Sequence, residues 1–385
     1  MTLPLVSIFL PTYSRYQSGY LKSSIDSVLA QTYKNFELLV VDDGSIDGTS
    51  EYIKELAASD KRIKHVRFDK NIGLLAFTTA KAYLESSGEY LTFIFDDCVY
   101  ETNHLEKLLA KLNSEPNLGM AYGKILIKHL DAEDEIYGQE TDLVSLSSDN
   151  CIGNACVMLK REVVEEIGWY DPHIILKRFC DWDLWLRVFY KFKVGFVDEI
   201  LATEFGPVLM DSLGNYHIAN IPLVKKYIAT NRSNILSPYN IIHGNYSLTQ
   251  INFPLSQEES YELMLIILDH FIRSADLAQI AAVYPKIQDE PFVQQSMVRL
   301  KSCNEFGLNE EFFEILGSLW FYIHYFKRSN AGERLKLHQI VKEYLKENED
   351  SLILNNAMLN SLSWKITKPL RDFKVGFDKL LKKNN

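Results

Sequence analysis

Cysteine is scarce in this sequence of 385 residues, and its spacing forms no metal-binding or disulfide pattern. The five cysteines are Cys98, Cys151, Cys156, Cys180 and Cys303, an odd number without a Cys-x-x-Cys pair. Zinc sites and the disulfide frameworks of small secreted domains need paired cysteines, so neither is expected to organise this fold. Scattered single thiols favour a reducing compartment, and we expect a cytoplasmic protein.

A long hydrophobic run is also missing. The longest, residues 315–326, is well short of the roughly 20 residues that a helix needs to span a bilayer, which predicts a buried helix there. The first four residues carry no cationic segment and lead directly into a strand-like run, so we expect no signal peptide.

Basic residues are outnumbered, because 41 Lys and Arg stand against 51 Asp and Glu, for a net charge of −10. This acidic excess argues against nucleic acid as a partner of the whole chain. The hydrophobic fraction of 47% and the charged fraction of 24% exclude a wholly disordered chain.

The last 22 residues, 364–385, reverse this charge. They hold seven Lys or Arg and two Asp, a local charge of +5, which leaves −15 for the remainder. Hydrophobic residues lie between the basic ones. Two interpretations stay open: a peripheral contact with the inner face of an anionic membrane, or a solvated basic helix.

Short apolar runs alternate with helical patterns through the first 200 or so residues. The expected strands are residues 5–10, 37–41, 62–68 and 90–95, and the expected helices are 20–31, 50–58, 74–86 and 103–112. Strands separated by helices of this length predict an α/β fold with a mostly parallel sheet and helices on both faces.

Beyond about Pro222 strand-like runs become rare and apolar residues recur at helical spacing. We therefore expect three parts: an α/β domain over residues 1–220, a mainly helical accessory domain over 221–360, and a basic segment over 361–385. The apolar stripes of the second part are expected to form its core.

Polar residues follow three of the expected strands, where open α/β sheets bind ligands. They are residues 11–15, 42–45 and 96–97. Neither a G-x-G-x-x-G turn nor a phosphate-loop lysine follows the first strand, which argues against a dinucleotide oxidoreductase or a common ATPase. Instead Tyr13 can stack on a base, Asp43 can accept from a ring N–H, and paired acids can hold Mg²⁺ or Mn²⁺ beside a diphosphate.

Five segments in this order resemble glycosyltransferase family 2. They are Val6-Ser7-Ile8-Phe9-Leu10-Pro11-Thr12-Tyr13, Glu37-Leu38-Leu39-Val40-Val41-Asp42-Asp43-Gly44-Ser45, Asn71-Ile72-Gly73, Gly88-Glu89-Tyr90, and Asp96-Asp97. The resemblance covers roughly residues 4–205. It implies an inverting enzyme with a Rossmann-like GT-A fold that uses a sugar nucleotide.

The resemblance also implies roles for the donor site. Tyr13 would stack on the nucleobase and Asp43 would bind its edge, while Pro11 and Thr12 would shape the loop beneath it. Arg15, in the same loop, is a further candidate for donor binding. A second donor-proximal loop would hold Asn71 and Gly73, which could alternatively form only a turn; Asp42 could likewise cap a turn or touch the ligand.

The acid pair is the family's metal-binding motif. Asp97 would be the direct ligand of Mn²⁺ or Mg²⁺, and Asp96 would lie near the donor ribose. Many members carry further acids where this chain has Phe95 and Cys98, so the motif is reduced. His217 is a candidate late metal ligand or, alternatively, a loop histidine.

Residues 179–187 resemble the Glu-Asp-x-Asp-Leu segment of the family, with Cys180 in place of the Glu. Asp181 would then be the catalytic base, the alternative being a helix N-cap. Asp183 and Arg187 are four residues apart, which predicts an ion pair on one helix face. Thr78-Thr79 stands where many members place Arg-Asn near the donor.

One more segment, residues 361–371, is similar to a Ser-x-Ser-Trp-Arg-x-Thr-x-Pro-Leu-Arg segment of bacterial surface-polysaccharide glycosyltransferases, with Lys365 in place of the Arg. It implies a bacterial glycan pathway.

The sequence therefore predicts an inverting transfer from a UDP- or dTDP-sugar to a hydroxyl of a glycan or lipid-linked glycan, assisted by Mn²⁺ or Mg²⁺. Self-association or a multidomain partner stays open. Two alternatives remain: a non-catalytic nucleotide-binding scaffold of a polysaccharide complex, and a sugar nucleotidyltransferase, which would need a Gly-rich loop after the first strand.

Overall fold

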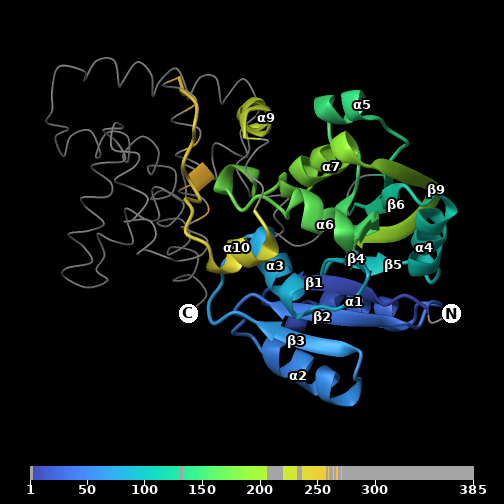
Figure 1. Ribbon diagram of the computed structural model, residues 1–385. Helices are drawn as coiled ribbons and strands as arrows, with labels where there is room; N and C mark the ends of the chain where they lie inside the picture. The colour runs from blue at the N-terminus through green and yellow to red at the C-terminus, as the bar shows by residue number, and fades with distance from the viewer. Residues whose placement is uncertain are drawn as a thin grey trace, which may run out of the picture. The chain divides into compact units, whose positions relative to one another are not determined.

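A computed structural model describes residues 3–129, 133–205, 220–231 and 236–256, together with the single positions 259, 263, 266, 267 and 270. Contacts divide the chain into two units, residues 1–215 with 219–254, and residues 216–218 with 255–385. All the elements named below belong to the first unit (Figure 1).

The first unit is an α/β structure built on one sheet. Its strands are β1 (Val6–Thr12), β2 (Phe36–Asp42), β3 (Ile63–Arg67), β4 (Tyr90–Phe93), β5 (Cys98–Tyr100), β6 (Leu118–Lys128), β7 (Glu135–Tyr137), β8 (Val157–Lys160) and β9 (Lys193–Phe205). Its α-helices are α1 (Tyr20–Leu29), α2 (Thr49–Ser59), α3 (Leu75–Glu85), α4 (His104–Ser114), α5 (Leu143–Ser148), α6 (Arg161–Ile167), α7 (Cys180–Lys191), α9 (Ile221–Thr230) and α10 (Pro238–His243). Short 3₁₀ turns are η1 (Tyr16–Ser18), η2 (Asn154–Cys156) and η3 (Ile174–Leu176).

The strand order is β3-β2-β1-β4-β8-β6-β9-β5, with β7 added beside β6. The pairs β3–β2, β2–β1, β1–β4 and β6–β9 are parallel, whereas β4–β8, β8–β6, β9–β5 and β6–β7 are antiparallel. The predicted α/β class is confirmed, but parallel pairing dominates only the half formed by β1 to β4. There each strand returns through a helix, which keeps successive strands in one direction.

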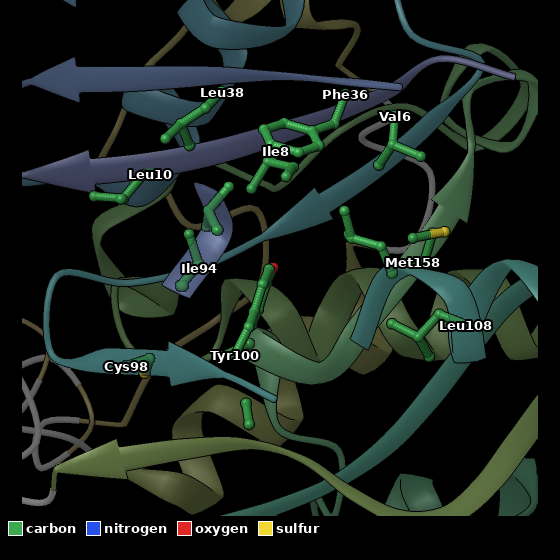
Figure 2. Close-up of a cluster of buried hydrophobic side chains, with 14 of the residues drawn as sticks. Val6, Ile8, Leu10, Phe36, Leu38, Ile94, Cys98, Tyr100, Leu108 and Met158 are labelled. Atoms are coloured by element: carbon green, nitrogen blue, oxygen red, sulfur yellow. The ribbon is translucent and has the colours of Figure 1, made fainter. Parts of the chain in front are cut away.

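Both faces of β1 are buried, because its side chains alternate between two packed layers. Ile8 and Leu10 join a cluster that includes Ile25 of α1, and Figure 2 shows these two strand residues near Leu38 of β2. On the opposite face, the Phe9 ring lies edge-on to Trp169, with ring centroids 6.1 Å apart. Helix α3 lies on this same face, because Trp169 donates to Thr79 of α3 and α3 contacts β1, so helices cover both faces of the parallel half, as predicted.

Helix α1 shows why the spacing of apolar residues predicted the helices correctly. Leu21, Ile25 and Val28 are its buried apolar residues and lie on one face at helical spacing. The four strands and four helices expected between residues 5 and 112 are all present, with ends shifted by a few residues. Such shifts are normal at the frayed ends of elements.

No helix within the described ranges is long and apolar enough to cross a membrane. Of the helical region expected over 221–360, α9 and α10 are described and pack within the first unit. Most of that region, including residues 315–326, lies outside the described residues. The basic segment 361–385 lies outside them as well.

Candidate functional site

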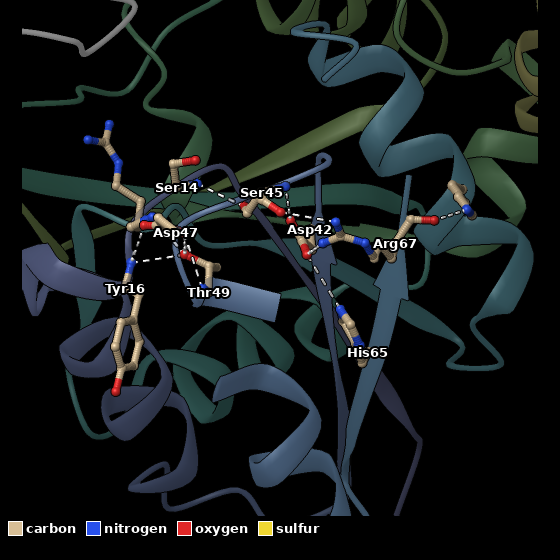
Figure 3. Close-up of polar contacts among 10 residues, drawn as sticks. Ser14, Tyr16, Asp42, Ser45, Asp47, Thr49, His65 and Arg67 are labelled. Carbon is tan, nitrogen blue, oxygen red and sulfur yellow. Dashed lines mark hydrogen bonds and ion pairs between the residues drawn. The ribbon is translucent and has the colours of Figure 1, made fainter. Parts of the chain in front are cut away.

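The loops after β1 and β2 meet at one edge of the sheet because the two strands run parallel and in register. Thr12 is the partner of Asp42, the last residue of β2. The N–H of Asp43 then donates to the carbonyl of Thr12 at 2.9 Å. The N–H of Ser14 donates to Ser45 Oγ at 2.8 Å, so side chains also tie the loops together (Figure 3).

A second set of contacts holds the chain just after Tyr13. Thr49 Oγ1, at the start of α2, accepts from the N–H groups of Arg15 and Tyr16 at 3.0 and 2.9 Å (Figure 3). Ser14 has a φ of 52°, a left-handed backbone that a non-glycine residue seldom adopts. The Tyr13 side chain is 41% exposed at this fixed turn, where it is free to stack on a planar ligand.

Asp43 is almost wholly enclosed, with 5% exposure. Its carboxylate oxygens accept from the N–H groups of Ile72 and Gly73 at 2.9 and 2.8 Å, so it holds the second loop. Burial raises the pKa of Asp43, while these two hydrogen bonds oppose the rise. Each oxygen keeps a further lone pair for a ligand donor. The loop that contains Asn71 and Gly73 is therefore joined to the site through Asp43.

The residue after Asp43 must be a glycine, because the neighbouring backbone leaves no room for a side chain. Gly44 has a φ of +78°, and a Cβ there would lie 2.5 Å from the backbone carbonyl carbon of Lys70. Any larger residue would push apart the two loops that Asp43 joins.

Asp42 has a structural role, which resolves the choice that the sequence left open. It is fully buried, accepts from the N–H of Ser45 at 2.8 Å, and forms an ion pair with Arg67 (Figure 3). Burial raises its pKa, but the nearby His65 ring, hydrogen bonds from Ser45 and the charge of Arg67 outweigh burial and lower the pKa.

Asp96 joins the loop after β1 to the end of β4. Its Oδ2 accepts from the Thr12 hydroxyl at 2.7 Å, and its Oδ1 lies 3.5 Å from Nε of Arg15. Burial, followed by the charge of Asp97, raises the pKa of Asp96. Thr12, Arg15 and Asp96, which were each predicted as donor-site residues, are therefore in direct contact.

Asp97 lies beside the end of β9, a proximity that the sequence did not signal. Its carbonyl accepts from the N–H of Phe205 at 2.9 Å, and its carboxylate accepts from the Cys98 thiol at 3.4 Å. Burial raises the pKa of Asp97, and the charge of Glu204 raises it further. Glu204, the strand partner of Cys98, is a third carboxylate in this region.

These residues fit a divalent cation only in part. Across the described ranges, no three His, Cys, Asp or Glu side chains already converge as a metal-binding group. Mg²⁺ sites commonly use one or two carboxylates with substrate phosphates and water, and the hard oxygens of Asp96 and Asp97 suit that pattern. His217 lies outside the described residues.

Asp181 lies in the first turn of α7, where Phe179 is the N-cap and Cys180 begins the helix. Its Oδ1 accepts from the N–H of Trp182 at 2.8 Å, and its Oδ2 accepts from the Asn150 amide at 3.4 Å. Burial raises the pKa of Asp181 to about 6. A carboxyl with this pKa can take up a proton near neutral pH.

The predicted pair of Asp183 and Arg187 is confirmed. Arg187 donates to Asp183 Oδ2 from Nη2 and Nε at 2.7 and 3.0 Å, and to the carbonyls of Ile167 and Trp169 at 2.7 Å each. Through Arg187 this pair fixes α7 against α6. Asp183 therefore has a structural role, which distinguishes it from Asp181.

Two other findings were not predictable from their local sequence. Thr79 lies buried in α3 and accepts from Nε1 of Trp169 at 2.9 Å, so it anchors the core. Lys177, just after η3, is 6% exposed, and its charge opposes the rise in the pKa of Asp43 that burial causes.

The chain is similar to known glycosyltransferases in sequence and fold. Residues 7–168 match the family described as glycosyl transferase family 2. An uncharacterized glycosyltransferase of Rickettsia typhi is 31% identical over 208 residues, which are 51% of this chain and 63% of that protein. Glycosyltransferase GlyA of Streptococcus pneumoniae is 36% identical over 107 residues, 28% of this chain and 15% of that protein. The chain spans less than two thirds of the length of these relatives.

Among solved structures, Staphylococcus aureus TarS residues 1–349 in complex with UDP-GlcNAc is similar, with a TM-score of 0.50 and 14% sequence identity. The match covers 81% of this chain and 90% of that one. At this identity the similarity concerns the fold.

Proposed function

Residues 7–168 match glycosyl transferase family 2, and from that match we propose that the chain transfers a sugar, with inversion, from a nucleoside-diphosphate sugar to a hydroxyl of a bacterial surface glycan. One observation carries the proposal. Thr12 accepts from the N–H of Asp43 through its carbonyl and donates to Asp96 through its hydroxyl, so one residue links the base-binding and acid-motif segments.

The donor would lie along this edge of the sheet. Tyr13 is exposed enough to stack on a base, and Asp43 keeps lone pairs to accept from a ring N–H. UDP and dTDP present nearly the same base edge, so both fit. TarS was crystallised with UDP-GlcNAc, and UDP is therefore the first nucleotide to test.

The diphosphate would lie near Asp96 and Asp97. When bound, Mn²⁺ or Mg²⁺ would supply a positive charge that stabilises the leaving nucleoside diphosphate. Asp97 would hold the cation and Asp96, already fixed by Thr12 and Arg15, would face the ribose.

Asp181 would act on the acceptor. It would remove the proton from the acceptor hydroxyl as that oxygen forms a bond to the anomeric carbon and the bond to the diphosphate oxygen breaks. The carboxylate must be ionised to do this, so the pKa of about 6 sets the acidic limit of the reaction.

The first experiment is a thermal-shift panel of UDP, dTDP, GDP and CMP, each with Mn²⁺, Mg²⁺ or EDTA. Ligand at 100 times its dissociation constant stabilises a protein by about 2.7 kcal/mol, a shift of a few degrees. We expect a metal-dependent shift with UDP or dTDP. The absence of any shift with every nucleotide would contradict the proposed donor site.

Product analysis then separates the alternatives. Release of nucleoside diphosphate from a donor sugar supports glycosyl transfer, whereas pyrophosphate release would indicate a nucleotidyltransferase. Binding without either product across a panel of glycan acceptors would favour the scaffold, to which the reduced acid motif at Phe95 and Cys98 points.

A further inference from the structure

The segment between β7 and η2 returns to the start of α7 and is fixed there. Trp182 Nε1 donates to the carbonyl of Leu146 at 2.7 Å, and Leu146 of α5 is fully buried. Helices α5 and α7 are in contact. The residues that follow α5 are thus held beside Asp181.

Asn150 lies in this segment with a defined amide orientation. Its Oδ1 lies 3.2 Å from the N–H of Ile152, which can only donate, so the atom on that side must be the oxygen. The Nδ2 group therefore faces Oδ2 of Asp181 and donates to it at 3.4 Å. The backbone carbonyl of Asn150 in turn accepts from the hydroxyl of Tyr137.

We propose that Asn150 is a positioning residue for Asp181, and that Tyr137 holds Asn150 in place. Asn150 fixes one carboxylate oxygen and Trp182 N–H fixes the other, so the carboxylate plane is set from two different segments. The role assigned to Asp181 rests on the proposed function, but its contact with Asn150 does not.

The electrostatic surroundings of Asp181 make this contact measurable. The titratable or charged groups around it are Arg178 just before α7, Cys180 at the start of α7, Tyr137 of β7, and Tyr170. Burial raises the pKa of Cys180 and both tyrosines, so these groups are neutral at pH 7 and Arg178 supplies the charge. The Asn150 donor adds a second stabilisation of the ionised carboxylate.

The test measures the pKa of Asp181 by ¹³C NMR in full-length protein labelled at the aspartate carboxyl carbon, with Asp181→Asn to assign the signal. Loss of the donor in Asn150→Ala should raise this pKa by about one pH unit, since one unit corresponds to 1.36 kcal/mol and a hydrogen bond to a charged group is of that order. Asn150→Asp should raise it further, because two carboxylates would then face each other.

Tyr137→Phe should raise the pKa by less, because the Asn150 amide stays but its backbone is released. Ser147→Ala is the matched control, since Ser147 is exposed on α5 and its hydroxyl donates to the carbonyl of Leu143 within the same helix. If the pKa of Asp181 stays within about 0.2 of the parent value in both Asn150 variants, the proposal is overturned. Loss of one hydrogen bond should change this pKa by more than that.

A second readout uses transfer activity. The acidic limb of kcat/KM against pH should move to higher pH in Asn150→Ala by the same amount as the NMR pKa, with nucleotide affinity unchanged. A fall in kcat at every pH without movement of the limb would show a packing role and contradict positioning. If the parent protein shows no transfer, the proposed function fails while the NMR titration still decides the role of Asn150.

Discussion

The hydroxyl of Thr12, in the last position of β1, donates a hydrogen bond of 2.7 Å to Oδ2 of Asp96, which follows β4. Because β1 and β4 are parallel neighbours, the carboxyl ends of the two strands bring these residues together. Arg15 lies on the other carboxylate oxygen, so Asp96 is held from one loop on both sides.

Thr12→Val tests this link, since valine keeps the shape and removes the hydroxyl. We expect a loss of about 1 kcal/mol in the free energy of unfolding, as for one hydrogen bond. Nucleotide affinity, measured by titration calorimetry, should fall about tenfold, equivalent to about 1.4 kcal/mol. Thr12→Ser should keep both values, and equal affinity in the valine variant would refute the role of this contact.

Asp97→Ala tests the cation site. We expect the Mn²⁺-dependent part of nucleotide binding to disappear, with the metal-independent affinity retained, because stacking on Tyr13 does not involve Asp97. The measurement is the dissociation constant of UDP with Mn²⁺ and with EDTA. Asp198→Ala, which removes a largely exposed acid of β9 paired with Lys124, is the control and should keep the metal effect.

Asp181→Asn and Asp183→Asn should separate chemistry from structure within one helix. The first should lower kcat by about 10²–10⁴ with donor affinity kept, the range typical of a general base. The second breaks the ion pair with Arg187, in which the two side chains are 9% and 12% exposed, and should lower the free energy of unfolding by about 3 kcal/mol.

Activity assays well below the unfolding temperature, together with urea denaturation, check both variants. Near-normal turnover in Asp181→Asn would remove it as the base. If folded Asp183→Asn loses as much turnover as Asp181→Asn, the assignment of a catalytic role to Asp181 and a structural role to Asp183 is wrong.

Asp42 predicts a specific acid dependence of stability. Its folded pKa is lowered, so it contributes stability above the unfolded pKa of about 3.9, and this contribution is lost as pH falls through the folded pKa. Asp42→Asn should therefore cost about 2–3 kcal/mol at pH 7 and progressively less below pH 4.

Urea denaturation at pH 7 and pH 3 measures this difference. Asp26→Asn is the matched control, because Asp26 forms an exposed pair with Lys22 and should change stability by less than about 0.5 kcal/mol. A cost for Asp42→Asn that is the same at both pH values would contradict a contribution from its ionised form.

Local sequence patterns were sufficient to identify the four strands and four helices between residues 5 and 112 and the polar residues at the strand ends. Apolar runs marked β1 and β2, and helical spacing marked α1 and the Asp183–Arg187 pair. These patterns depend on side chains a few residues apart, so they can be interpreted without knowing the fold. That Tyr13 and Asp43 lie at the same edge of the sheet was predictable, because neighbouring parallel strands end at a common edge.

Which distant residues share the site depended on the tertiary structure. Glu204 lies near Asp97 because β9 pairs antiparallel with β5, and Asn150 reaches Asp181 because α5 packs on α7. Thr79 is turned to the core by Trp169, and the second half of the sheet is mixed in direction. Such contacts arise from packing between segments far apart in the chain, and local periodicity carries no information about which segments will pack together.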